Sequence, residues 1–447
     1  MNRILEMFSG LGCCNGVRSL GLIVMTLAGH VLHAQSSKVN AALVGTVQDA
    51  TGAAVAGAEI VLRHTDTGRT RVVQTDRLGF FSASELPVGT YEIRVTRRGL
   101  ATYATDITLT VGQTSRLRIE LVPARLQQQV TVEARPPTLV SSETAVTTTI
   151  DQDRIEESPV HSRNYLDFVL LSGGVTTANS QQNSSAPPAT GGGFVFGGLR
   201  PQSNSVSIDG LDNNEEFTGS ARTELSPEIV REFQVVNNGL SAEFGGASGG
   251  SINVVTKSGT NLFHGDDFIF VQNGALDAET PFEIESRKPR LTRYRAGASL
   301  GGPVKKGRTF FYAAFEQESN RSEAASDINP QLASAVNQFL AAGGLPGEAT
   351  RRITTGLFPT SRSETEASGK LNQEIGSSGN LMLRYAFTGN REAGDAFNTG
   401  GLTVASARGN SSTSDSGLAG SLTSVPRQTI VNDLRFQVSG RRVSLRT

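Results

Sequence analysis

Cysteine, tryptophan and long apolar runs are all scarce in this chain of 447 residues. Its two cysteines, Cys13 and Cys14, are adjacent near the N-terminus, and tryptophan is absent. The sequence after Cys14 therefore excludes a disulfide framework and a cysteine-based metal site. After residue 34 there is also no run of about 18 apolar residues, which excludes a protein that crosses a membrane by helices.

Charge of either sign is not in excess. Lysine and arginine number 41 against 42 aspartates and glutamates, so the net charge of −1 gives no electrostatic case for nucleic acid as a partner. Glycine is abundant at 49 residues, while apolar residues make up only 37%. This combination is typical of many short strands and turns, and of barrel strands that are apolar on one face only.

Histidine and acidic residues form no catalytic or metal-binding pattern. The five histidines lie near the N-terminus or are isolated, and no nucleophile is paired with a base. One acidic stretch, with Asp209, Asp212, Glu215 and Glu216, is either a calcium-binding loop or a solvated loop, and its spacing is not that of an EF-hand. We therefore expect no catalytic residues, no enzyme activity, no cofactor and no metal.

Residues 1–34 have the pattern of a secretory signal peptide. Arg3 and Arg18 supply positive charge, an apolar run follows at 20–28, and Ala34 offers a small residue for cleavage. The alternative is a short membrane anchor, although the run is well under the ~20 residues of a spanning helix.

Residues 40–122 show seven short strand patterns separated by turn signals, which predicts a seven-stranded β-sandwich. The motifs are Val44-Gly45-Thr46-Val47, then 52–58, then Thr75-Asp76 with Gly79-Phe80-Phe81, then Leu86-Pro87 with Gly89 and Tyr91. In this order they resemble the carboxypeptidase regulatory-like domain, whose fold is a transthyretin-like sandwich. The resemblance does not imply peptidase activity, and it supports sugar binding only weakly.

Residues 138–257 carry a second set of ordered motifs. Short helices are predicted at 151–156, 164–171 and 227–232, and strands at 233–236 and 252–255 flank a glycine-rich turn. The motifs are Arg163-Asn164-Tyr165-Leu166, Gly198-Leu199-Arg200-Pro201, Val206-Ser207-Ile208-Asp209-Gly210, and the stretch 228–257. They resemble the mixed α/β plug domain of TonB-dependent outer-membrane receptors. That resemblance implies the plug signature Arg200, Asp209, Gly210, Gly245, Gly249, Gly250, Asn253 and Thr256.

Residues 126–137 read as a linker that contains one β-prone run. Taken alone, this run is either the last strand of the sandwich or an extended segment that a partner strand can pair with. Within the receptor family it falls where the TonB box lies, which implies binding of a TonB-type periplasmic energy transducer. The box residues are Val130, Thr131, Val132, Glu133 and Ala134.

Residues 261–447 alternate between apolar and polar side chains with a period of two, as in Leu434, Phe436 and Val438 against Asp433, Arg435 and Gln437. This alternation fits a soluble antiparallel sheet or a membrane barrel, and the plug resemblance favours the barrel. Seven strands are predicted, at 263–271, 291–300, 309–318, 365–375, 380–389, 415–424 and 429–439. A helix begins at Pro330 inside a long connection at 319–364. Receptors of this kind close with about 22 strands, so we expect a partial barrel and an N-terminal portion of a longer receptor.

The sequence thus predicts a mainly β chain. Its parts are a signal peptide, a β-sandwich, a TonB-box linker, a plug and the first strands of an incomplete transmembrane barrel. The resemblance implies a receptor in the outer membrane of a bacterium that imports an extracellular ligand, with glycans and peptides as candidates. The sandwich and box would lie in the periplasm, and lipid would surround the barrel. The alternative is a non-enzymatic surface module that binds carbohydrate or matrix through the sandwich.

Overall fold

Two sheets with one shared core form the first part of the chain in this computed structural model. The structure describes residues 39–124, 146–157, 163–177, 193–215, 221–240, 246–278, 288–326, 328–342, 352–376, 378–396 and 408–446. One sheet has the order β4-β1-β7 and the other β3-β2-β5-β6. The strands are β1 (Ala41–Asp49), β2 (Glu59–His64), β3 (Thr70–Gln74), β4 (Phe80–Leu86), β5 (Gly89–Thr96), β6 (Tyr103–Leu109) and β7 (Thr114–Leu121).

Alternating side chains explain why this part folds as a sandwich. In β7 every second residue is buried, and β1 shows the same period of two. The buried sides of both sheets share one apolar core, which includes Leu43, Phe81, Ile60, Leu62 and Ile93. The predicted seven-stranded sandwich is therefore confirmed.

A five-stranded sheet forms the centre of the plug unit, the name used here for the described residues from 146 to 257. Its order is β12-β11-β14-β13-β8, and β14 runs parallel to β11. The strands are β8 (Val146–Ile150), β11 (Ser205–Ile208), β12 (Leu211–Asp212), β13 (Val230–Asn238) and β14 (Ser251–Thr256). All six residues of β14 are buried, as expected for a strand with a neighbour on each side and core on both faces. A separate two-stranded sheet joins β9 (Val175–Thr177) and β10 (Phe194–Phe196).

Of the three helices predicted for this unit, the first forms as expected and the other two differ. The first is α2 (Gln152–Glu157), and Asp151 accepts a hydrogen bond from the Arg154 amide at its start. The second is a 3₁₀ helix, η3 (Tyr165–Leu171), which buries Tyr165 and Phe168 and leaves Leu170 exposed. Three residues per turn place positions i and i+3 on one face, which buries Leu166 together with Val169 and turns Leu170 outward.

The third predicted helix is only a short turn. It forms as the 3₁₀ turn η6 (Pro227–Ile229), because Val230 already pairs with Thr256 in the sheet. A further 3₁₀ turn, η5 (Pro201–Ser203), follows Arg200.

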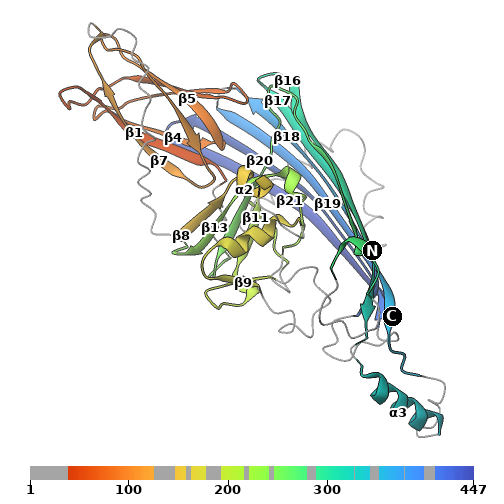
Figure 1. The fold of residues 1–447 in the computed structure, drawn as a ribbon. Helices are drawn as coiled ribbons and strands as arrows, with labels where there is room; N and C mark the ends of the chain where they lie inside the picture. The colour runs from red at the N-terminus through yellow and green to blue at the C-terminus, as the bar shows by residue number, and fades with distance from the viewer. Residues whose placement is uncertain are drawn as a thin grey trace, which may run out of the picture. The chain divides into compact units, whose positions relative to one another are not determined.

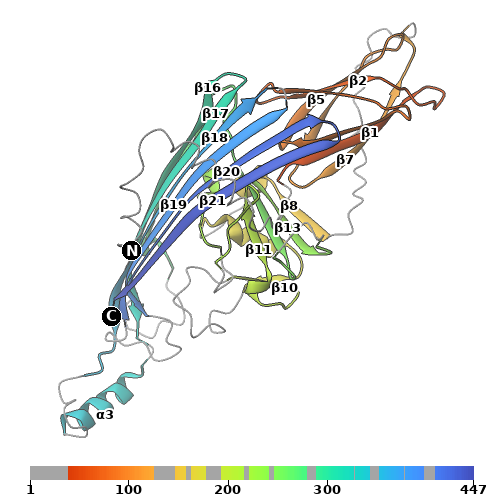
Figure 2. The ribbon, with the colours of Figure 1, turned by 180° about the vertical axis from the view of Figure 1, so that it is seen from behind.

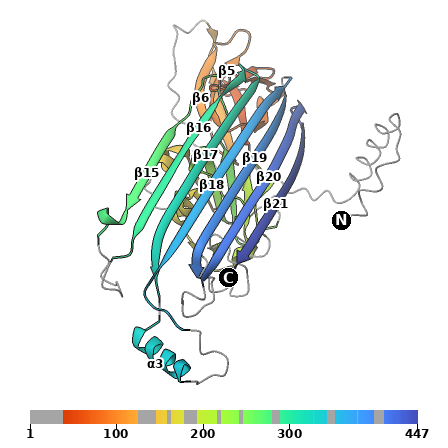
Figure 3. The same ribbon diagram turned by 90° about the vertical axis from the view of Figure 1, so that its right-hand side faces the viewer.

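A sheet of seven antiparallel strands follows, in the order of the sequence from β15 to β21 (Figure 3). The strands are β15 (Asp267–Asn273), β16 (Leu291–Lys305), β17 (Thr309–Ala325), β18 (Leu357–Ile375), β19 (Gly379–Ala396), β20 (Arg408–Arg427) and β21 (Ile430–Arg446). The sheet is unclosed in the described residues, since β15 and β21 are its two ends. The plug unit lies against one face of it (Figures 1 and 2).

The two faces of this sheet differ in character, as the alternation predicts. Tyr294 and Val438 are 51% and 71% exposed on the outer face, whereas Met382 and Arg384 are buried on the plug side. The connection predicted at 319–364 is shorter than expected, because β17 and β18 pair along their whole length up to Ala325 and Leu357. Residues 319–323 and 360–364 in these extensions are polar, so backbone pairing extends the ladder where no apolar pattern marks it.

One longer helix, α3 (Pro330–Ala341), lies in the connection between β17 and β18. Asn329 caps it by accepting a hydrogen bond from the Gln331 amide, as the sequence predicts. Within the part of the chain that the structure describes, no helix is both long and apolar enough to cross a membrane.

Candidate functional site

At the Asp209-Gly210 turn the plug unit contacts charged side chains from three strands of the seven-stranded sheet, namely β18, β19 and β21. The turn forms a two-residue hairpin between β11 and β12, in which Ile208 pairs with Leu211. Asp209 has a φ of 50° and Gly210 a φ of 77°, which is the geometry of a type I′ turn and explains the Asp-Gly pair. The Asp209 amide donates to the Val254 carbonyl at 2.8 Å, which fixes the turn beside β14.

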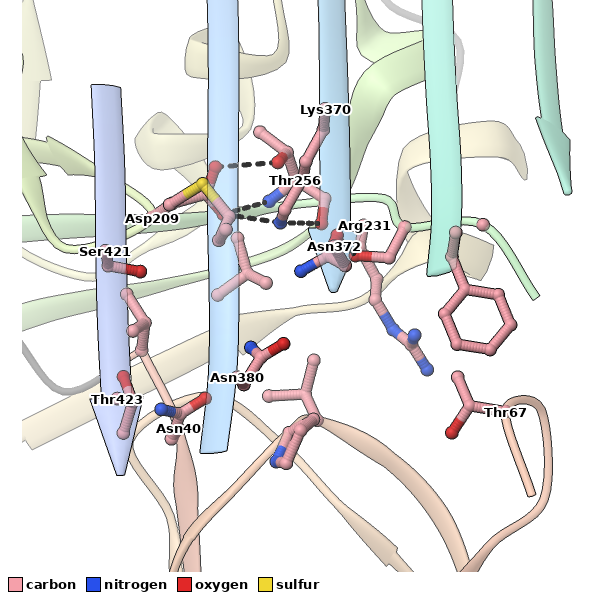
Figure 4. A pocket seen from close by; sticks show the side chains of 18 of the residues that line it. Asn40, Thr67, Asp209, Arg231, Thr256, Lys370, Asn372, Asn380, Ser421 and Thr423 are labelled. Atoms are coloured by element: carbon pink, nitrogen blue, oxygen red, sulfur yellow. Dashed lines mark hydrogen bonds and ion pairs between the residues drawn. The ribbon is translucent and has the colours of Figure 1, made fainter. Parts of the chain in front are cut away.

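The Asp209 carboxylate accepts three hydrogen bonds and forms an ion pair with a second cation. The amide and the hydroxyl of Thr256 donate to it at 3.0 and 2.7 Å. Lys370 of β18 donates at 3.0 Å (Figure 4). The Nε atom of Arg384 of β19 lies 3.3 Å from the other oxygen. Burial alone would raise the pKa of Asp209, but the two cations and Thr256 outweigh it and lower the pKa. Asp209 is therefore a buried carboxylate whose charged form is stabilised by Lys370 and Arg384.

Three strands of the sheet also hold the backbone of this turn. Lys370 donates to the Thr256 carbonyl at 3.1 Å, and Arg384 donates to the Ile208 carbonyl at 3.3 Å. Arg435 of β21 donates to the Gly210 carbonyl at 2.7 Å. We call the set Asp209, Thr256, Lys370, Arg384 and Arg435 the aspartate anchor.

The sequence did not indicate this anchor. It placed Asp209 in an acidic loop that either binds calcium or is solvated, and both readings were wrong for Asp209 because its oxygens are buried and already paired. Asp212 is exposed, and Glu216 lies outside the described residues. The sequence feature that could have indicated it is a single Lys or Arg on the plug-facing side of three strands, at Lys370, Arg384 and Arg435. These residues indicate a common site only when the register of the strands is known.

Further polar contacts join the plug unit to the sheet, and two groups of them are ion pairs. Arg222 and Thr223 reach Asp415 of β20 at 3.2 and 3.0 Å. Arg163 lies 2.6 Å from Glu228 and 3.7 Å from Glu316 of β17. The contact face between the two parts is thus rich in ion pairs, which can be exchanged for water with less loss than an apolar core.

The other signature residues lie at two separate places. Gly249 and Gly250 lead into β14, where a Cβ on Gly250 would stand 2.2 Å from the Phe196 ring and one on Gly249 2.3 Å from Asn204. Asn253 is buried in β14 and accepts from the Ser207 hydroxyl at 3.0 Å. Arg200 is exposed, and Gly245 lies outside the described residues, as do the signal segment and all five TonB-box residues.

A cavity of about 120 Å³ lies beside the anchor (Figure 4). Its uncharged lining combines apolar side chains, among them Val88, Val255 and Met382, with amides and hydroxyls from the sandwich and from strands β18 to β20. The polar side chains include Asn40, Thr67, Asn372, Asn380, Ser421 and Thr423. These polar side chains offer hydrogen bonds to water or to a polar solute.

Glu232 of β13 is a second buried carboxylate in the plug unit. It accepts a hydrogen bond from the Val111 amide of the sandwich at 2.5 Å. Burial raises the pKa of Glu232 to about 7, although that hydrogen bond and Arg231 oppose the rise. The protonated form is therefore favoured in the folded chain more than in the unfolded chain.

We expect the stability of the chain to fall with rising pH through this group. Because the folded pKa is raised, the contribution is present below about pH 4.5 and is lost as the pH passes about 7, at a cost of up to about 3 kcal/mol. Glu232→Gln should make the fall in the thermal unfolding midpoint between pH 5 and 8 smaller, since an amide oxygen still accepts from Val111. Part of the fall should remain, because burial raises the pKa of Glu224 to about 7 as well. Glu120→Gln, at an exposed carboxylate of β7, is the control, and an equal fall in Glu232→Gln would contradict this account.

Three family models match the chain in order. The carboxypeptidase regulatory-like domain matches residues 42–122, the TonB-dependent receptor plug domain matches 139–251, and an outer-membrane β-barrel domain matches 255–335. The TonB-dependent transporter Oar from Myxococcus xanthus is 29% identical over 362 residues, which is 75% of this chain and 32% of that protein. The chain therefore spans about a third of the length of this relative.

Solved structures of outer-membrane receptors are also similar to the chain. The siderophore receptor PirA from Acinetobacter baumannii is 18% identical with a TM-score of 0.39, over 67% of this chain and 44% of that one. The outer-membrane transporter YddB from Escherichia coli is 14% identical with a TM-score of 0.47, over 66% and 38%. In the three domain matches, their order and the identity to the Oar transporter, the chain is similar to TonB-dependent outer-membrane receptors that carry a carboxypeptidase regulatory-like domain before the plug.

Proposed function

We propose that this chain is the N-terminal part of a receptor that imports an extracellular ligand across the outer membrane when an energy transducer rearranges its plug. The aspartate anchor is the observation that carries the proposal. A plug that must move needs an attachment that is specific when closed and reversible when open. Buried, hydrogen-bonded ion pairs fix a geometry strongly, yet they add little net stability compared with apolar packing.

The path of force through the chain supports the same proposal. The TonB box at 130–134 would be captured as a strand by a TonB-type transducer in the periplasm. Among the described residues, the first plug strand after it is β8, which has five residues and lies at the edge of the sheet beside β13. β13 pairs in turn with β14, which carries Thr256 of the anchor. A pull on the linker would therefore act on the anchor through two adjacent strands.

Uptake by cells that produce the complete receptor tests the proposal. Labelled glycans, peptides and metal chelates would be screened for accumulation in cells with and without the transducer. We expect at least one class to accumulate only when the transducer is present. Binding to the cell surface without any transducer-dependent accumulation would instead support a surface module that holds carbohydrate or matrix through the sandwich.

A further inference from the structure

The sandwich contacts the plug unit through a small apolar cluster. Val88 and Val111 of the sandwich pack with Val255 of β14, and all three are buried. Val39 packs against the same cluster. Val255 immediately precedes Thr256, so this contact touches the strand that carries the aspartate anchor.

Polar contacts surround this cluster on the plug side. The Val111 amide donates to the buried Glu232 carboxylate at 2.5 Å. Asp66, in the turn between β2 and β3, lies 3.7 Å from Arg231. Both partners in the plug unit belong to β13, the strand that joins β8 to β14.

The same β2–β3 turn also binds the seven-stranded sheet and the segment that leads into it. Arg69 forms an ion pair of 3.0 Å with Glu374 near the end of β18, and both side chains are less than one fifth exposed. The Asn261 amide donates to the Asp66 carbonyl at 3.0 Å, and its side chain donates to the Thr67 carbonyl at 2.6 Å. The Asn261 side chain also accepts from Gly307 in the turn before β17. One short turn is thus tied to two other parts of the molecule.

These contacts enclose the cavity beside the anchor. Its lining takes Asn40 and Thr67 from the sandwich, Arg231 and Thr256 from the plug unit, and the ends of β18 to β20 from the sheet (Figure 4). The sandwich therefore covers one side of the space into which the anchor faces.

We propose that the sandwich is an intramolecular latch: it docks on β13, on Val255 and on Glu374, holds the anchor strand in place and closes the cavity beside it. Undocking of the sandwich then opens the cavity and frees β14 to move. This role goes beyond ligand import, because docking is a property of the resting chain and its test needs neither a ligand nor a transducer.

Charge reversal at the Arg69–Glu374 pair tests the latch in the purified receptor that contains the full chain. Arg69→Glu and Glu374→Arg each place like charges against each other, and the double variant restores an opposite pair. The readout is the rate at which a maleimide modifies Ser421→Cys, a reporter in the cavity lining; the chain has no other cysteine after Cys14. We expect each single reversal to raise this rate at least about fivefold and the double variant to return it close to the starting value.

Arg63→Glu is the matched control, because Arg63 pairs with Glu92 inside the sandwich and is more than half exposed. It should leave the labelling rate unchanged. A second measurement reports docking itself: Asp66→Cys with Asn261→Cys should form a disulfide in the otherwise unaltered chain and form it less with Arg69→Glu. Equal labelling rates in all variants, or failure of this disulfide to form in the unaltered background, would overturn the latch.

Discussion

Replacing Asp209 by asparagine should loosen the plug unit by about 3 kcal/mol, the cost expected when one partner of a buried ion pair is removed. The asparagine has nearly the same shape but leaves Lys370 and Arg384 buried without a counter-charge. The amides of β14, including that of Thr256, should then exchange with solvent roughly 100-fold faster by local opening. Hydrogen exchange followed by mass spectrometry on the complete receptor measures this directly.

The control for this experiment is Asp212→Asn, at an exposed carboxylate on the same hairpin. It should leave the exchange of β14 unchanged. Adding Lys370→Met to Asp209→Asn removes one of the stranded cations and should recover part of the loss. If Asp209→Asn exchanges like the unaltered receptor, the anchor does not hold the plug and the proposal fails at its main observation.

Val132→Pro in the predicted TonB box should weaken binding of the transducer's C-terminal domain at least about tenfold. Proline removes a backbone N–H group and fixes φ, so the segment loses a ladder hydrogen bond when it pairs with a partner strand. A pull-down or a titration with the purified transducer domain measures the change. Val132→Ala keeps the backbone amide and should bind the transducer domain nearly as well as the unaltered chain. Unchanged binding by Val132→Pro would show that residues 130–134 are not the TonB box.

The strand patterns of the sequence predicted most of the fold because they report burial directly. Alternation in β7 and β16 follows which side of a sheet meets core, plug or surroundings, and the sequence shows it without any tertiary information. The Asp-Gly turn at 209–210 and the Asn329 cap were also predictable, because each rests on the local chemistry of one or two residues.

The aspartate anchor could not be predicted in the same way. Its members are separated by up to 226 residues, from Asp209 to Arg435, and they meet only because the order and register of β18 to β21 bring them to one side of the sheet. The 3₁₀ form of η3 was missed for a related reason. Its apolar residues fit both helical periods, and packing of Tyr165 and Phe168 into the plug core decides between them.

The most direct measurement of the central claim is energy-dependent exposure of a buried plug residue in living cells. Ser251 on β14 is 2% exposed, so Ser251→Cys should resist a membrane-permeant maleimide in the resting receptor. We predict that labelling appears in cells with an energised transducer and is absent when the transducer is deleted or when Val132→Pro is added. Labelling that is equal with and without the transducer would contradict a plug that is moved through its TonB box.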